Sequence, residues 1–216
     1  MKKRILKYTT SLSKIIFPIL FKILISLKLN RRTINFLSDK AYNSNNKYDF
    51  NILIKNLLKN SKLSALDVGA QGGFNSDNFF PNKYNHFFEN ILIEPIKAEA
   101  DKLKNTKFVI NKGLWSKKEN KKLYILDNRL GSSSMYIPNE ESFDLHNINK
   151  KDFEDYKVTR TIEIECDTLS NQLSELNINS LDYLKIDTQG AELEILKGIG
   201  NYRPLLIKIE AHFFSM

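Results

Sequence analysis

Asp67 and the residues after it are the first group in the sequence whose types and spacing could do chemistry. In the stretch "ALDVGAQGGF" an apolar run leads into this carboxylate, and glycines follow it at positions 69, 72 and 73. Glycine lets the backbone turn with positive φ and lets a ligand approach without a Cβ in the way. Glu94 ends the next apolar run, where a carboxylate can accept hydrogen bonds from both hydroxyls of a ribose. The pattern therefore predicts a site for an adenosine-containing cofactor.

Asp67 also narrows the choice of cofactor. A dinucleotide would bring a pyrophosphate to this loop, and an anion disfavours a carboxylate two residues before the first glycine. S-adenosylmethionine instead carries an ammonium and a sulfonium, which a carboxylate complements. The glycines also fail to match G-x-G-x-x-G, because Gln71 stands where the second glycine should be, and no G-x-x-x-x-G-K-[ST] motif occurs. We therefore predict S-adenosylmethionine as the cofactor.

The elements that must position these residues alternate between strands and helices. Apolar runs predict five parallel strands, over residues 62–68, 87–95, 106–114, 180–188 and 204–213. Helical spacing and helix-ending residues predict helices between them, over 96–105, 168–178 and 189–199. Such alternation is typical of a mainly parallel, doubly wound α/β sheet, which binds ligands at the carboxyl ends of its strands. That edge collects five polar residues: Asp67, Glu94, Asn111, Asp187 and Glu210.

The middle of the chain predicts further structure outside these five strands. The stretch 121–128 could form a hairpin with 111–116, and alternating apolar residues predict a strand with one wet face over 158–169. The only cysteine, Cys166, lies near the end of that strand, so we expect a small buried residue and no intrachain disulfide. The charged stretch 143–157 could be a surface helix or a lid.

Four stretches together resemble the FkbM-type S-adenosylmethionine-dependent methyltransferases. They are "LDVGAQGGF", "LIEPIKAEADKL", "CDTLSNQL" and "LDYLKIDTQGAELEILKG", and the resemblance covers residues 63–212. It implies a Rossmann-like methyltransferase sheet and transfer of a methyl group to a hydroxyl oxygen, often on a sugar of a surface polysaccharide, a glycolipid or a natural product. The family commonly has Asn where this chain has Gln71, whose amide can still hydrogen-bond the cofactor. The cofactor-binding candidates are then Asp67, Gly69, Gln71, Gly73, Glu94 and Asn111.

Methyl transfer to oxygen makes simple demands on the enzyme. The methyl group of a sulfonium is already activated, so the protein must align the acceptor oxygen, exclude water and remove the hydroxyl proton. Asp187 is the first candidate base, and Lys185 on the same strand face could hold it or the nascent alkoxide. Glu192 and Glu210 are the next candidates. Alternatively, Lys185 and Asp187 form a structural ion pair and Glu192 only favours a helix N-terminus. These acids and His212 could also converge on a metal, but no tight spacing such as H-x-x-x-H occurs, and we predict no metal site.

The positive charge of the chain is concentrated at its N-terminus. The formal net charge is +8, from 33 Lys and Arg against 25 Asp and Glu; residues 1–32 hold nine of the basic residues and no acid, which leaves 24 against 25. A neutral remainder argues against a nucleic-acid partner. The apolar run 15–29 is broken by Lys22 and contains Pro18, so it is short for a membrane span. It could be an amphipathic helix on an anionic membrane, a helix packed on the domain or on a second subunit, or a membrane anchor.

These observations predict three parts: a basic amphipathic segment over 1–32, a helical extension over 33–61 and a methyltransferase domain over 62–216. The lone cysteine and the lack of a signal-peptide cleavage site favour a cytoplasmic protein, peripheral on the inner face of the membrane. Methyltransferases of this fold usually continue for two strands beyond the fifth, so we expect the final strands to be missing. The alternative function is a non-catalytic, membrane-associated remnant of the same fold that binds a cofactor or a partner.

Overall fold

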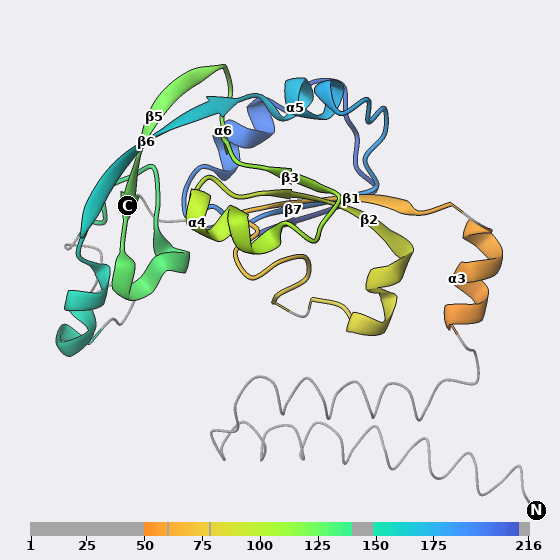
Figure 1. Ribbon diagram of the computed structural model, residues 1–216, viewed down its shortest axis with the longest axis horizontal. Helices are drawn as coiled ribbons and strands as arrows, with labels where there is room; N and C mark the ends of the chain where they lie inside the picture. The colour runs from red at the N-terminus through yellow and green to blue at the C-terminus, as the bar shows by residue number, and fades with distance from the viewer. Residues whose placement is uncertain (1–49, 60, 78, 140–148, 212–216) are drawn as a thin grey trace, which may run out of the picture. The chain divides into compact units, whose positions relative to one another are not determined.

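The computed structural model describes residues 50–59, 61–77, 79–139 and 149–211 (Figure 1). The chain divides into two compact units, residues 1–54 and 55–216, and helix α3 (Phe50–Leu58) crosses that division. The predicted segment 1–32 and most of the predicted extension 33–61 lie outside the described residues. The fold described below belongs to the second unit.

Five parallel strands form the main sheet. They are β1 (Leu63–Val68), β2 (Phe88–Ile93), β3 (Phe108–Ile110), β7 (Tyr183–Ile186) and β8 (Leu206–Ile209), in the spatial order β3-β2-β1-β7-β8. This order confirms the predicted doubly wound α/β fold, because the chain runs outward from β1 in one direction and then returns to the other side with β7. All four residues of β7 are buried, as expected for a parallel strand covered on both faces.

A second sheet of three strands joins the first. It contains β4 (Gly113–Leu114), β5 (Glu119–Ile125) and β6 (Arg160–Asp167) in the order β4-β6-β5. The predicted strand 158–169 is confirmed as β6, but the predicted hairpin between 111–116 and 121–128 is wrong. β6 lies between those segments, antiparallel to β5 and parallel to β4. β6 therefore pairs its backbone groups with a strand on each edge, whereas beside a local hairpin it would have a neighbour on one edge at most.

Short helices connect the strands. They are α4 (Lys97–Ala100), which continues as the 3-10 turn η2 (Asp101–Leu103), α5 (Leu169–Glu175) and α6 (Glu192–Lys197). Thr168 caps α5, because its side chain accepts a hydrogen bond from Asn171 N at 3.1 Å, and α6 ends at Gly198. Three further 3-10 turns are η1 (Asn82–Phe87), η3 (Asp127–Ser132) and η5 (Lys150–Tyr156). The last of these covers the end of the charged stretch 143–157, whose residues 143–148 lie outside the described part.

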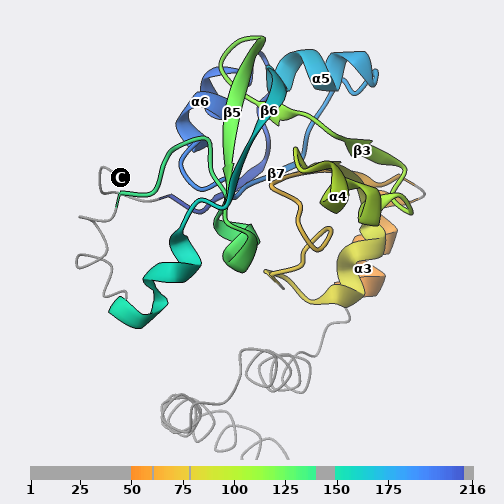
Figure 2. The same cartoon turned by 60° about the vertical axis from the view of Figure 1, so that its left-hand side comes forward.

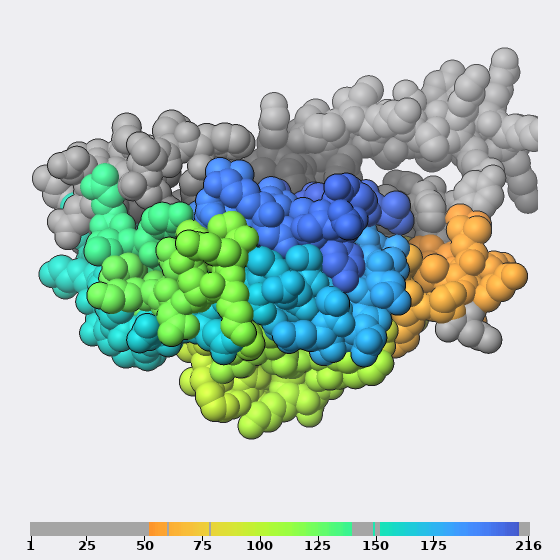
Figure 3. Space-filling model, turned by 90° about the horizontal axis from the view of Figure 1, so that it is seen from above, coloured from red at the N-terminus to blue at the C-terminus, as the bar shows by residue number. Residues whose placement is uncertain are grey.

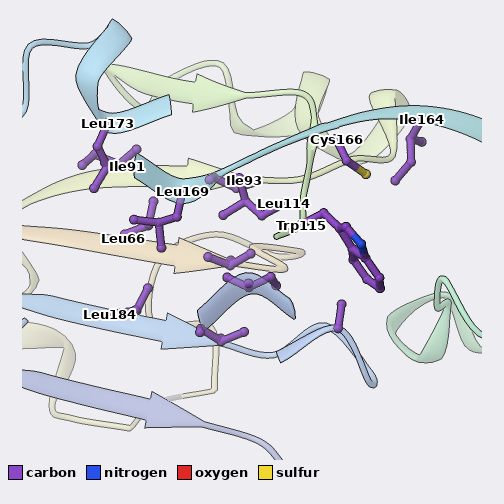
Figure 4. Close-up of a cluster of buried hydrophobic side chains, with 14 of the residues drawn as sticks. Leu66, Ile91, Ile93, Leu114, Trp115, Ile164, Cys166, Leu169, Leu173 and Leu184 are labelled. Carbon is purple, nitrogen blue, oxygen red and sulfur yellow. The ribbon is translucent and has the colours of Figure 1, made fainter. Parts of the chain in front are cut away.

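One apolar core joins the two sheets. Figures 1 and 2 show the second sheet, α5 and α6 on the same face of the main sheet, and Figure 3 shows these segments forming a continuous outer surface. Leu66 and Leu184 of the main sheet pack in one cluster with Leu169 of α5 and with Ile164 and Cys166 of β6 (Figure 4). Cys166 is a fully buried free thiol, as predicted, and burial raises its pKa to about 11. The second sheet is therefore fixed to the main sheet by shared burial.

β8 is an edge strand in the described part of the chain. It pairs with β7 alone there, and Leu205 and Leu206 are 83% and 50% exposed. No helix among the described residues has the length and apolar character needed to cross a membrane.

Candidate active site

A pocket opens at the carboxyl ends of β1, β2 and β7, beside the point where the strand order reverses. One side is formed by the turn after β1, by the end of β2 and by the end of β7. The other side comes from the second sheet and its loop, with Gly113, Leu123, Leu130, Ser133 and Met135. The topological rule predicted the first side. It did not predict the second, because sequence periodicity does not show where β5 and β6 pack.

Asp67 and Lys185 form a buried ion pair on neighbouring strands. The register places them side by side in β1 and β7, and Lys185 Nζ lies 3.0 Å from Asp67 Oδ1. Asp67 is fully buried and Lys185 is 3% exposed. Burial raises the pKa of Asp67, and the Lys185 ammonium opposes that rise. Of the two, only Lys185 is part of the described pocket lining, and Asp67 lies behind it as its ion-pair partner.

The glycines after β1 serve two different needs. Gly69, Gly72 and Gly73 have φ of 80°, 82° and 90°, a region that favours glycine. A Cβ on Gly69 would lie 2.0 Å from Asp187 O, so the absence of a side chain allows the ends of β1 and β7 to touch. Around Gly73 the nearest atom to such a Cβ is 3.7 Å away, so there only the turn requires glycine. Gly69 lines the pocket and Gly73 does not.

Gln71 of the glycine turn lies close to η3. It lines the pocket, and its Oε1 would lie 3.0 Å from a Cβ placed on Gly131. The amide therefore lies where the two walls of the pocket meet.

Glu94 places a nearly buried carboxylate in the pocket. It is 4% exposed, its Oε1 accepts from Ile96 N at 2.8 Å, and burial raises its pKa to about 7. Asn111 is exposed and lies outside the described lining. Its Nδ2 donates to Glu94 O and to Pro95 O, both at 2.9 Å. Asn111 thus holds the backbone that carries Glu94.

Asp187 presents a half-buried carboxylate to the same pocket. Its Oδ1 accepts from Gln189 Nε2 at 3.0 Å, and its Oδ2 lies 3.9 Å from Lys185 Nζ. Burial raises the pKa of Asp187 and the Glu210 carboxylate adds to the rise, whereas the Lys185 ammonium opposes it. A carboxylate whose pKa is raised in a cleft is suited to accept a proton from a substrate.

Glu192 and Glu210 lie beside the pocket, outside its described lining. The Glu192 carboxylate accepts from Thr188 N at 3.1 Å, from Thr188 Oγ1 at 3.0 Å and from Gly190 N at 2.9 Å. This binds the turn after β7 to the start of α6. Glu210 is exposed just past β8, where its backbone N donates to Ile186 O at 3.0 Å.

The charges around the pocket suit a cationic ligand better than a phosphate. Its described lining contains three carboxylates, Asp77, Glu94 and Asp187, and two lysines, Lys112 and Lys185. Both lysines are already paired, Lys112 with Glu165 at 2.9 Å and Lys185 with Asp67. Asp77 is likewise paired with Lys208, so Glu94 and Asp187 are the carboxylates of that lining that could complement a sulfonium or an ammonium, and no lysine of the lining is left for a pyrophosphate. The donor set therefore fits S-adenosylmethionine.

A metal centre finds no support in the described residues. They contain no group of three or more His, Cys, Asp and Glu side chains that could hold an ion. His212, one of the metal-ligand candidates in the sequence, lies outside them.

The fold and the pocket together define a Rossmann-like α/β protein with a ligand site at the carboxyl ends of its strands. A family model described as the methyltransferase FkbM domain matches residues 67–215. The chain therefore belongs to the FkbM methyltransferase family, and the resemblance carried by the four sequence stretches is confirmed. No curated protein and no solved structure matches the chain.

Proposed function

We propose that this FkbM-family methyltransferase uses S-adenosylmethionine to methylate a hydroxyl group, on a sugar of a glycan, a glycolipid or a natural product. The observation that carries the proposal is a single pocket in which the glycine turn, Glu94 and Asp187 meet. A cofactor site and a proton acceptor thus share one cleft, as transfer to a hydroxyl requires.

The proposed cofactor residues come from two strand ends. Glu94 would accept hydrogen bonds from the ribose hydroxyls, and the Gly69 backbone and the Gln71 amide would contact the rest of the molecule. When bound, S-adenosylmethionine supplies a methyl group activated by its sulfonium. The Lys185 ammonium lies within 4 Å of the carboxylates of Asp67 and Asp187, and in their ionised forms the three groups carry a net charge of −1. That net charge favours a cationic ligand nearby.

The proposed proton acceptor is Asp187. Its carboxylate takes the proton of the acceptor hydroxyl, and the Lys185 ammonium at 3.9 Å stabilises the ionised form before the proton arrives. Leu123, Leu130 and Met135 on the facing wall exclude water from the reacting atoms.

Calorimetry with S-adenosylhomocysteine tests the cofactor site. The wild-type chain should bind it, and Glu94→Gln should weaken binding by about tenfold because the neutral amide is a poorer acceptor than a carboxylate. Glu89→Gln is the matched control, since this exposed residue of the same strand pairs with Lys107 at 2.7 Å, outside the described pocket lining. A wild-type chain that does not bind S-adenosylhomocysteine would rule the cofactor out.

Transfer itself is tested with S-adenosylmethionine carrying a labelled methyl group and a panel of glycan and glycolipid acceptors. Label should appear as an alkali-stable ether on a hydroxyl, and Asp187→Asn should abolish it while S-adenosylhomocysteine still binds. Binding without transfer to any acceptor would favour the alternative, a non-catalytic cofactor-binding remnant.

A further inference from the structure

The turn after β7 holds a strained residue next to the proposed base. Gln189 has φ of 57°, in the left-handed region, and Gly190 follows with φ of 114°. A glutamine persists in that conformation only where its surroundings hold it. Gln189 Nε2 donates to Asp187 Oδ1 at 3.0 Å. The conformation of the turn therefore sets the orientation of the Asp187 carboxylate.

Two side chains hold the backbone of this turn through hydrogen bonds. The Glu192 carboxylate accepts from the backbone N–H groups of Thr188 and Gly190. From the loop after η3, which is bridged to β5 at Tyr124, Ser134 Oγ donates to Gln189 O at 2.6 Å. Gln189 lies between the two residues that Glu192 binds. In the described structure, the hydrogen bond from Ser134 is the one that holds the backbone of Gln189 itself.

Ser134 is itself fixed in place. It is 5% exposed, its N donates to Tyr124 O at 3.2 Å, and its O accepts from Tyr124 N at 2.8 Å. Its Oγ also accepts from Tyr136 N at 3.0 Å. A hydroxyl has one proton to donate, and with Tyr136 supplying a donor to the oxygen, that proton is directed to Gln189 O.

We propose that Ser134 is a positioning residue for Asp187, acting through its hydrogen bond to the Gln189 carbonyl. The serine does not touch the carboxylate. Because Ser134 is bridged to Tyr124 of β5, its hydrogen bond fixes the turn relative to the second sheet. The turn in turn holds the Gln189 amide within hydrogen-bonding distance of Asp187. The second sheet would then orient the proposed base as well as enclose the pocket. This inference rests on the proposed function, in which Asp187 accepts the substrate proton.

The expected signature is a change in the ionisation of Asp187. Its hydrogen bond from Gln189 favours the charged form, so losing that bond raises the pKa of Asp187. The other charged groups acting on this carboxylate include Lys185 of β7, Asp67 of β1, Glu192 of α6 and Glu210 after β8. Replacing Ser134 by alanine removes none of those groups, so a change in the pKa of Asp187 would come from a change in the conformation of the turn.

The test is a carbon-13 NMR titration of the Asp187 carboxyl in the full chain, assigned with Asp187→Asn. Ser134→Ala should raise the pKa of Asp187, whereas Ser134→Thr keeps a hydroxyl and should leave the pKa at the wild-type value. Ser134→Cys should raise the pKa of Asp187 by a smaller amount, and it replaces the alanine variant if that variant does not fold. Gln189→Gly, which tolerates positive φ and lacks the donor, should match Ser134→Ala. Ser132→Ala is the control, because that serine accepts from Arg129 Nε and lies outside the described pocket lining.

The outcomes separate this inference from the proposed function. A raised pKa in Ser134→Ala and Gln189→Gly, with wild-type values in Ser134→Thr and Ser132→Ala, supports positioning by the hydroxyl. A wild-type Asp187 pKa in Ser134→Ala or Ser134→Cys overturns it, as does a failure of Ser134→Thr to restore the value. Calorimetry with S-adenosylhomocysteine is run on the same samples. Absence of wild-type binding would remove the proposed function, whereas the titration still decides whether Ser134 orients Asp187.

Discussion

Glu94 is a carboxylate whose surroundings favour its protonated form. Burial in the pocket wall raises its pKa to about 7, while a single backbone donor, Ile96 N, lies at 2.8 Å as partial compensation. The ionised form is the better acceptor for two ribose hydroxyls, so the proposed contact between Glu94 and the cofactor would require the loss of a proton near neutral pH.

We therefore predict that affinity for S-adenosylhomocysteine rises with pH. With a pKa of about 7 in the free protein, and binding to the ionised form only, the dissociation constant should be about tenfold weaker at pH 6 than at pH 8. Glu94→Gln should remove most of this dependence, because an amide does not titrate. Calorimetry across that pH range provides the measurement. A wild-type affinity that stays flat over the range would show that Glu94 does not meet the cofactor.

Gly69 and Gly73 allow a matched test of why glycine is needed. Both have left-handed φ, so alanine costs each position about 1–2 kcal/mol in backbone conformation. At Gly69 the new Cβ would also meet Asp187 O at 2.0 Å, which forces β1 and β7 apart. We expect Gly69→Ala to lower the free energy of unfolding by at least about 2 kcal/mol more than Gly73→Ala. Urea unfolding of the two variants measures the difference, and equal losses would contradict the close packing.

At the scale of elements, the sequence predicted the main sheet well and the second sheet poorly. Strands β1, β2 and β7 are mostly apolar segments with a carboxylate at or just past their carboxyl ends, a pattern that can be recognised locally in the sequence. The predicted third strand over 106–114 is divided, because Gly113 and Leu114 leave the main sheet and pair with Cys166 and Asp167. That pairing joins residues far apart in sequence, and no local pattern encodes it.

The residues of the candidate site were also only partly predictable from the sequence. Asp67, Glu94 and Asp187 were found because a parallel sheet brings strand ends together. Ser134 and Gln189 were not singled out as site residues, since their roles depend on a backbone carbonyl and on a φ value of 57°. A serine-rich loop and a glutamine before glycine give no local signal of either contact.

Helix α5 supplies a prediction at the element scale. Thr168 caps it through the bond from Asn171 N at 3.1 Å, and Leu169 and Leu173 bury the helix against the core. Thr168→Ala should lower the free energy of unfolding by about 1 kcal/mol, because one N–H of the first turn loses its acceptor. Thr168→Ser keeps the acceptor and should lose much less. Thermal or urea unfolding compares the two, and an equal loss in both variants would assign the effect to the threonine methyl group.

For the whole molecule, the distribution of charge matters more than its sum. Nine of the 33 basic residues lie within residues 1–32, where the chain has no acid, and the remainder is close to neutral. We propose that this segment binds anionic membrane surfaces from the cytoplasmic side. Each Lys or Arg near such a surface contributes about 1 kcal/mol, so nine of them suffice for peripheral attachment at low salt.

The full chain should therefore sediment with vesicles that contain phosphatidylserine at low salt and be released at about 1 M salt, where the Debye length falls to about 3 Å. Replacing Lys2, Lys3, Lys7, Lys14, Lys22 and Lys28 by glutamine lowers the charge of the segment from +9 to +3 and should abolish sedimentation. Vesicles of phosphatidylcholine alone are the control. Binding that resists high salt and does not need anionic lipid would indicate a membrane anchor. No binding to either vesicle would favour a segment that packs on protein, because a helix buried on the domain or on a second subunit offers its apolar face to neither surface.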